Sequence, residues 1–343
     1  MKKYLKFKFV FLISIFLLVM RIPRSSASGF RLYQSFQSSA LVSILTGAPP
    51  CGELLAGKSA NAMENPIALD RLSEQLQEIN EPVEINILTF NVWGVFRLFT
   101  ESLDKRVKLI TTSINGFDLV NLQETTVVET KDITDKNNFY PYKVRYDNTS
   151  LLRLGSGLST LSKYKILEEK FLLFSSCLLP DCINNKGVLF LRLEIPKLGI
   201  VDLYNTHYQS MPISTTHRLL ANKDFEKFYK ENNQDNLTII TGDFNLTEKD
   251  EDYRDFVKKF KVIDTFRVKN PNIPGFTYDK EKNSSALFMA ARIDYIFVVH
   301  NEKYNIEILE SKIMFTEKQE ELFISDHFGL ATLLKITKKG PGI

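Results

Sequence analysis

The strongest constraint on the fold is an order of strand and helix patterns that begins near Glu84. Ile85–Phe90 is a buried-strand pattern, and residues 104–115 carry apolar side chains at helical spacing. Similar patterns predict further strands at 118–122, 156–162, 187–194, 200–206, 237–241, 293–299 and 329–335, and helices at 216–232 and 250–260. Because several strands follow one another without a helix between them, we expect an α/β sandwich of mixed sheets, not a doubly wound parallel sheet.

The N-terminus has the order of a secretory signal peptide. Residues 1–8 are basic, Val10–Met20 is apolar apart from one serine, and Ser25-Ser26-Ala27 offers small residues for cleavage. The alternative is an uncleaved membrane anchor, but the apolar run is shorter than the roughly 20 residues of a bilayer span. We therefore predict a signal peptide at 1–27 and a secreted or periplasmic protein.

Residues 28–80 differ in character from the rest of the chain. Ser, Ala and Gly are common in the first part, and Leu69, Leu72 and Leu76 then lie at helical spacing. We expect a partly helical extension that carries no chemistry. The main domain would span residues 81–338.

Composition excludes a disordered chain, and net charge bears on the kind of partner. An apolar fraction of 44% and an aromatic fraction of 12% exclude a disordered chain. The predicted signal peptide holds six basic residues and no acid, so its removal changes the formal net charge from +3 to −3. A chain so close to neutrality has no overall field that attracts nucleic acid, although a local basic groove remains open.

The chain has three cysteines, and two of them are close in sequence. Cys177 and Cys182 enclose four residues in a loop-like segment, whereas Cys51 lies in the extension. A local disulfide and two free, partly buried thiols are both open, because an exported protein can form disulfides. The spacing matches no metal-binding cysteine motif.

Polar residues typical of catalytic sites lie at the ends of the predicted strands. They are Asn91, Glu124, His207, Asp243, Asn245, Asp294, Asp326 and His327. Taken singly, each is more often a structural turn or strand-end residue. Because strands deliver their ends to a common edge of a sheet, we expect the set to converge. Oxygen ligands suited to Mg²⁺, together with two histidines able to transfer protons, predict metal-assisted hydrolysis of a phosphoester.

In its order of motifs, the chain from about residue 84 to 336 resembles the endonuclease/exonuclease/phosphatase superfamily. The motifs are Asn91, Gln123-Glu124, His207, Gly242-Asp243-Phe244-Asn245, Arg292-Ile293-Asp294-Tyr295 and Ser325-Asp326-His327. The resemblance implies a four-layered α/β/β/α sandwich, DNase-I-like, with the site at one end of two mixed sheets. It also implies that residues 81–338 form a catalytic domain of this type.

Within the superfamily, the chain is most similar to the neutral sphingomyelinases. The similar segments are Asn91-Val92-Trp93-Gly94, Gly155-Ser156-Gly157-Leu158, Asn185-Lys186-Gly187-Val188, Thr206-His207-Tyr208-Gln209-Ser210 and Phe276-Thr277-Tyr278-Asp279. The resemblance implies cleavage of sphingomyelin to ceramide and phosphocholine with Mg²⁺, or with Mn²⁺ or Co²⁺ in its place. It implies a phospholipid or membrane surface as partner, and no protein partner is inferred.

The resemblance also suggests roles for the polar set. We expect Glu124 to bind the ion, with Asn91 and Asp326 as further metal-site residues. The remaining residues would be catalytic: His327 as general base, Asp294 as the carboxylate that orients it, Asp243 and Asn245 as positioning groups for water and phosphate, and His207 as a donor to the phosphate or leaving alkoxide.

Membrane binding is the point at which the chain departs from the sphingomyelinases. Secreted bacterial members carry a long aromatic hairpin before the Ser-Asp-His motif, whereas Ile313–Ile324 holds only Phe315 and Phe323. Other apolar residues are candidates for a lip that contacts substrate or membrane, namely Trp93, Phe96 and Tyr278, with Leu287-Phe288-Met289 as a second candidate. For Trp93 and Phe96 the alternative is packing beneath the first helix.

Two other functions remain open at this point. A secreted DNase-I-like nuclease would use the same metal and histidines, because it also hydrolyses a phosphodiester. A protein that binds lipid or a partner without catalysis would use the same cleft, but none of the polar positions has been replaced. The near-neutral charge and the motif around Trp93 favour lipid over nucleic acid as the substrate.

Overall fold

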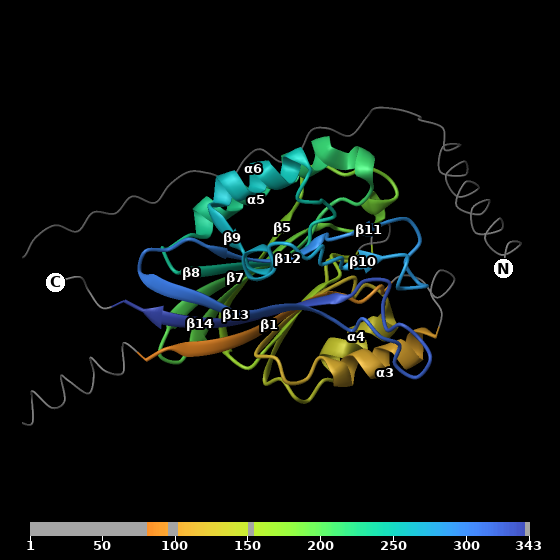
Figure 1. Ribbon diagram of the computed structural model, residues 1–343, viewed down its shortest axis with the longest axis horizontal. Helices are drawn as coiled ribbons and strands as arrows, with labels where there is room; N and C mark the ends of the chain where they lie inside the picture. Colours follow the sequence, from red (N-terminus) through yellow and green to blue (C-terminus); the bar gives the residue numbers. More distant parts are fainter. Residues whose placement is uncertain (1–80, 95–101, 150–153, 340–343) are drawn as a thin grey trace, which may run out of the picture. The chain divides into compact units, whose positions relative to one another are not determined.

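The computed structural model describes residues 81–94, 102–149 and 154–339 (Figure 1). The predicted signal peptide at 1–27, the extension at 28–80, Cys51 and Phe96 lie outside these ranges. Within the described part of the chain, no helix is long and apolar enough to cross a membrane. The expectations for export and for the domain boundaries stay predictions.

Two six-stranded mixed sheets form the centre of the fold. The first has the order β13 (Tyr304–Met314), β14 (Gly329–Lys338), β1 (Val83–Asn91), β2 (Leu119–Gln123), β4 (Leu158–Ser162) and β3 (Tyr142–Tyr146). The second has the order β5 (Lys165–Leu173), β6 (Gly187–Ile195), β7 (Gly199–His207), β8 (Leu237–Asp243), β12 (Asp294–Val299) and β9 (Val262–Asp264). The pairs β1–β2 and β7–β8 are parallel, and the other pairs are antiparallel.

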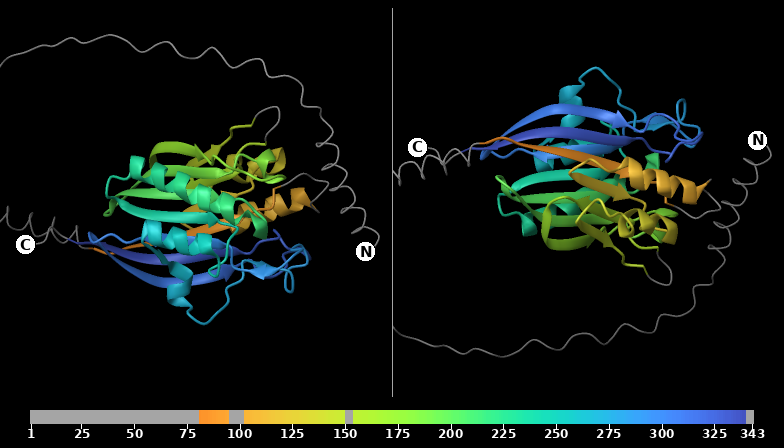
Figure 2. Two further views of the ribbon diagram at one scale, coloured as in Figure 1. Left: turned by 90° about the horizontal axis from the view of Figure 1, so that it is seen from above. Right: turned by 90° about the horizontal axis from the view of Figure 1, so that it is seen from below.

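Helices cover the outer face of each sheet (Figure 1 and Figure 2). α3 (Leu103–Ser113) and α4 (Val128–Asp135) pack on the first sheet, and α5 (Thr215–Asn232) and α6 (Glu251–Phe260) pack on the second. The shorter elements are η2 (Asp181–Ile183), η3 (Pro212–Ser214), α7 (Thr265–Lys269) and the hairpin of β10 (Tyr278–Asp279) and β11 (Ala290–Ala291). The predicted α/β/β/α sandwich is confirmed.

The strands that the sequence predicts are the eight interior strands of the two sheets. The four edge strands, β13, β3, β5 and β9, are not predicted. An interior strand is buried by a neighbour on each side and by a layer on each face, so its sequence is a continuous apolar run. The edge strands are largely half-buried or exposed, and their mixed composition gives no such run.

Apolar packing holds the four layers together. Between the sheets, Ile87 and Leu330 of the first sheet belong to one buried cluster with Leu203 and Ile239 of the second. Beneath α5 and α6, a separate cluster consists mainly of aromatic rings. Burial of these side chains stabilises the fold by about 25 cal/mol per Å² of apolar surface removed from water.

Phe225 provides a test of this packing. Its side chain is fully buried, and its ring centroid lies 5.4 Å from that of Tyr204 and 5.0 Å from that of Phe260. Phe225→Ala should lower the free energy of unfolding by about 3–5 kcal/mol, because it leaves a cavity. Phe139→Ala, at a position that is 47% exposed, should cost less than about 1 kcal/mol. Denaturant unfolding would measure both, and equal losses would contradict this packing.

Candidate active site

Strand register aligns the polar residues at one end of the sandwich. His207 lies opposite Asp243 in the parallel pair β7–β8, and Asp243 lies opposite Asp294 in the antiparallel pair β8–β12. In the other sheet, Asn91 lies opposite Gln123, and Glu124 follows. The structure thus brings together the residues that the strand ends suggest, namely Asn91, Glu124, His207, Asp243, Asn245, Asp294, Asp326 and His327.

Asn91 joins two carboxylates that belong to different sheets. Its Nδ2 donates to Glu124 Oε1 at 3.1 Å and to Asp243 Oδ2 at 3.0 Å. Beneath them, Gln123 Nε2 donates to Asn205 Oδ1 of β7 at 2.7 Å, which ties the sheets together. The two carboxylates therefore face a common point at fixed separation.

His327 is held between two acidic residues. Its Nδ1 lies 2.9 Å from Asp294 Oδ2, and its Nε2 lies 3.8 Å from Asp243 Oδ2. Burial acts to lower the pKa of His327, but Asp294 and Asp243 outweigh it and raise this pKa well above the usual value. The Tyr278 ring packs edge-on against the imidazole, with centroids 5.1 Å apart. Asp294 thus fixes the ring so that Nε2 points to the carboxylate cluster.

His207 has the opposite electrostatic environment. Its Nε2 lies 3.0 Å from Lys186 Nζ and 3.4 Å from Asp243 Oδ2. Burial, followed by the positive charge of Lys186, lowers the pKa of His207 well below its usual value. The imidazole is therefore neutral near pH 7 and accepts a hydrogen bond from Lys186. The two histidines of the site are in this way pushed toward different protonation states.

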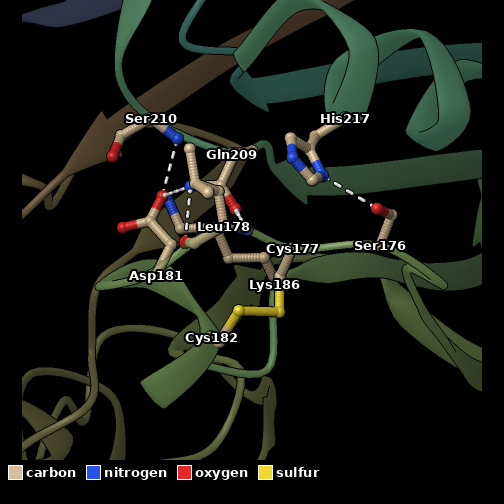
Figure 3. The surroundings of a disulfide bond; sticks show 9 residues. All are labelled: Ser176, Cys177, Leu178, Asp181, Cys182, Lys186, Gln209, Ser210 and His217. Carbon is tan, nitrogen blue, oxygen red and sulfur yellow. Dashed lines mark hydrogen bonds and ion pairs between the residues drawn. A yellow bond between two sulfur atoms is a disulfide. The ribbon is translucent and has the colours of Figure 1, made fainter. Parts of the chain in front are cut away.

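Lys186 is a site residue to which sequence reasoning assigned no role. Its buried ammonium contacts Asp181 Oδ2 at 2.8 Å and donates to the Tyr208 carbonyl oxygen at 2.7 Å. The disulfide Cys177–Cys182 closes the loop that carries Asp181, so the disulfide, and not the pair of free thiols, is present (Figure 3). The segment Asn185-Lys186-Gly187-Val188 is the part of the sequence that could have indicated a role for Lys186. Its Gly187 lies opposite His207 in the pair β6–β7.

Arg106 of α3 is a second contributor that the sequence patterns did not indicate. Its guanidinium donates to the carbonyl oxygens of Val92, Trp93 and Ile324, each at 3.0 Å. It thereby fixes the chain just after Asn91 and just before Asp326. The Arg106 guanidinium carbon also lies 4.7 Å from the centroid of the Trp93 ring.

The proposed lip residues occupy different surroundings. Trp93 is partly buried beneath Arg106, and Tyr278 is 9% exposed and contacts His327. The Tyr278 ring lies in the site beside His327, the Trp93 ring packs against Arg106 of α3, and neither ring offers much surface to a membrane. Their contact with substrate stays a prediction, and Phe96 lies outside the described residues.

The acidic cluster fits a divalent cation. Burial raises the pKa of Glu124, burial and Asp294 raise the pKa of Asp243 to about 6, and burial together with Glu124 raises the pKa of Asp326 to about 7. Asp294 Oδ1 is buried without a hydrogen-bond partner. These carboxylates are costly to ionise together because they lie close to one another. Their oxygens are the hard ligands that Mg²⁺ prefers.

Two overlapping sets of side chains could hold the ion. Ligand atoms of Asp243, Asp294 and His327 lie within 4.8 Å of one another. Asp294 and His327 already bond to each other, however, so we favour the Glu124 and Asp243 carboxylates on either side of Asn91. The predicted ligands Glu124, Asn91 and Asp326 stay a prediction, with Asp243 as an addition.

Residues 88–327 match the profile of the endonuclease/exonuclease/phosphatase family. The chain belongs to this family. A protein described as a candidate neutral sphingomyelinase of Drosophila melanogaster is 28% identical over 281 residues, which cover 76% of this chain and 62% of that protein. A sphingomyelinase of Mycobacterium tuberculosis is 26% identical over 176 residues, which cover 49% of this chain and 35% of that protein. The chain thus spans less than two thirds of the length of either relative.

Solved structures show the same fold at lower identity. The beta toxin of Staphylococcus aureus matches with a TM-score of 0.60 and 22% identity, over 72% of this chain and 99% of that one. A second structure of this toxin, with bound magnesium ions, has a TM-score of 0.58, 21% identity and coverage of 75% and 100%. TDP2 of D. rerio, in complex with a single-stranded DNA product, has a TM-score of 0.61, 18% identity and coverage of 73% and 98%.

We expect Mg²⁺ to stabilise the folded chain through Glu124. An ion that binds only the folded state raises the free energy of unfolding, by about 2.7 kcal/mol at about 100 times its Kd. Glu124→Gln removes one charged ligand and should abolish most of this gain, whereas the exposed Glu169→Gln should keep it. Thermal unfolding with Mg²⁺ or chelator would measure the effect. A full Mg²⁺ shift in Glu124→Gln would show that the ion binds elsewhere.

Mg²⁺ affinity should increase with pH between about 5 and about 7. The ion binds ionised carboxylates, and the pKa of Asp243, raised to about 6 by burial and Asp294, lets protons compete below that value. Above about pH 7 the affinity should level off. Calorimetric titrations across this range would test the expectation, and a constant affinity would contradict the assignment of Asp243 to the ion site.

Proposed function

We propose that the chain is a divalent-metal-dependent phosphodiesterase that hydrolyses sphingomyelin to ceramide and phosphocholine. The observation that carries the proposal is the convergence of Glu124, Asn91 and Asp243 with the His327–Asp294 pair around one point. The relatives named as sphingomyelinases support sphingomyelin as the substrate. The near-neutral charge expected after removal of residues 1–27 supports lipid over nucleic acid.

Each side chain has a role that follows from its contacts. When bound, the divalent ion would neutralise charge on the phosphate oxygens as the transition state forms. Asp294 holds Nδ1 of His327, which leaves Nε2 free to take the proton of the attacking water. Without an ion, Asp294 and Asp243 raise the pKa of His327 well above its usual value. Positive charge bound at the Glu124–Asp243 cluster would lower this pKa and so favour the neutral imidazole that the step needs.

On the other side of Asp243, His207 and Lys186 face the phosphate and leaving group. Lys186 lies 3.0 Å from His207 Nε2 and donates to it, so the ammonium of Lys186 is the group of this pair that would supply positive charge where negative charge develops. Asn245 donates from its backbone N–H to Asp243 Oδ1 at 2.9 Å and from Nδ2 to the Tyr208 carbonyl oxygen at 3.1 Å. It would hold Asp243 in place and position the phosphate.

A nuclease of the same fold is the second candidate. The support for it is the similarity to TDP2, whose structure contains a DNA product. We also propose that the protein acts after export, in a periplasm or outside the cell. The basic and apolar N-terminus supports export, and so does the Cys177–Cys182 disulfide, because such bonds persist in oxidising compartments.

His327→Ala should reduce turnover by more than about a hundredfold if His327 is the general base. His300→Ala is a matched control, because His300 is exposed at the end of β12 and has no role in the site. Sphingomyelin vesicles and plasmid DNA would be offered side by side to residues 28–343, with Mg²⁺ or with chelator.

Metal-dependent release of phosphocholine with intact DNA is the expected result. Nicked DNA with intact lipid would support the assignment of the active site and favour the nuclease as the function. Near-normal turnover by His327→Ala would contradict the assignment of the base.

A further inference from the structure

Exposed apolar side chains lie in two loops next to the active site. The first loop follows β7 and carries Met211, which is 44% exposed, and Ile213, which is 75% exposed. The second is the tip of the β10–β11 hairpin, where Leu287 is 59% exposed and Phe288 is 78% exposed. We call these four residues the apolar rim. Large apolar side chains exposed in groups typically mark a binding surface.

Both loops are fixed directly to catalytic elements. The first begins just after His207, and Arg218 Nη1 donates to the Met211 carbonyl oxygen at 2.8 Å. In the hairpin, the Leu287 N–H donates to the Tyr278 hydroxyl at 2.8 Å, and the Tyr278 ring packs against His327. The rim residues are therefore carried by anchored loops.

The two loops flank the catalytic carboxylates. In the strand order β7–β8–β12, the first loop leaves β7 and the hairpin leads into β12. Asp243, at the end of β8, lies between them. A ligand that touches both loops would therefore meet apolar side chains on two sides of a site built for a phosphodiester.

The segment that carries the aromatic hairpin in secreted bacterial sphingomyelinases does not provide such a surface here. Phe315 packs on Phe90 with ring centroids 5.0 Å apart, and Phe323 packs near Phe328 with centroids 6.2 Å apart. Both rings are partly buried. Among the described residues of the loops that adjoin β7 and β12, the four rim residues are the most exposed large apolar side chains.

We propose that the apolar rim inserts into the surface of a lipid bilayer and holds the active site over the head groups. The inference rests on the proposed function, because it takes the substrate to be a membrane phospholipid. A protein seated on both loops would cover Asp243 and its neighbours, whereas a bilayer presents its phosphodiesters at that position. The rim therefore fits a membrane better than it fits a protein partner or a second copy of the chain.

Vesicle binding without turnover tests the rim. Residues 28–343 would be mixed with sphingomyelin–phosphatidylcholine vesicles in chelator, and the bound fraction measured by flotation. The double variant Ile213→Ser/Phe288→Ser should bind vesicles at least about tenfold more weakly than the wild type, because two apolar anchors are lost. Leu167→Ser is the matched control, since Leu167 is 44% exposed on β5 and lies toward the opposite end of the sheet from Gly187 and His207. It should bind like the wild type.

A second measurement does not depend on a loss of binding. Phe288→Trp should show a blue-shifted emission on vesicles and quenching by brominated lipid, whereas Leu167→Trp should show neither beyond the signal of Trp93. Thermal unfolding of each variant would show that it is folded.

Unchanged vesicle binding by the double variant, or no spectral shift of a Trp at position 288, would contradict the proposal that the rim inserts into the bilayer. The same holds if the wild type self-associates through these loops and does not bind vesicles. Phosphocholine release by the wild type with Mg²⁺ is scored separately. Vesicle binding through the rim without phosphocholine release would reject sphingomyelin as the substrate and support the rim as the membrane-binding surface. Phosphocholine release with vesicle binding that does not depend on the rim would support sphingomyelin as the substrate and reject the rim.

Discussion

The register of β7, β8 and β12 is the constraint on which the site depends. It places His207, Asp243 and Asp294 side by side at the ends of three neighbouring strands of the second sheet. Gly242 makes this approach possible, because a Cβ at its backbone position, where φ is +145°, would lie 2.1 Å from the Thr206 carbonyl oxygen. A slip of one residue would turn Asp243 to the opposite face and separate it from both partners.

Buried charge explains why the remaining site residues are arranged as they are. The acids Glu124, Asp243 and Asp326 share a small volume, and burial raises the pKa of each. Asn91, Lys186 and His327 offset part of this repulsion, and a divalent ion would offset more. The apolar packing of the sheets and helices holds these groups where, in a looser structure, they would move apart.

The sequence predicted those parts of the fold in which neighbouring residues are all buried. Interior strands are buried on all sides and read as apolar runs, so their ends, and with them Asn91, Glu124, His207 and Asp243, could be found. Edge strands such as β5 and β13 have mixed surroundings and gave no pattern. The contacts of Lys186 and Arg106 depend on tertiary structure, as does the choice of a disulfide at Cys177 and Cys182, so local spacing does not determine them.

Anomalous scattering from a bound ion would locate the metal site most directly. Crystals of residues 28–343 soaked with Mn²⁺ and phosphocholine would be measured at the manganese edge. We expect a peak within bonding distance of the Glu124 carboxylate, on the side shared with Asn91 and Asp243, with the phosphate next to His327. A peak remote from Glu124, or a phosphate remote from both histidines, would contradict the claim that these strand ends form one metal-dependent active site.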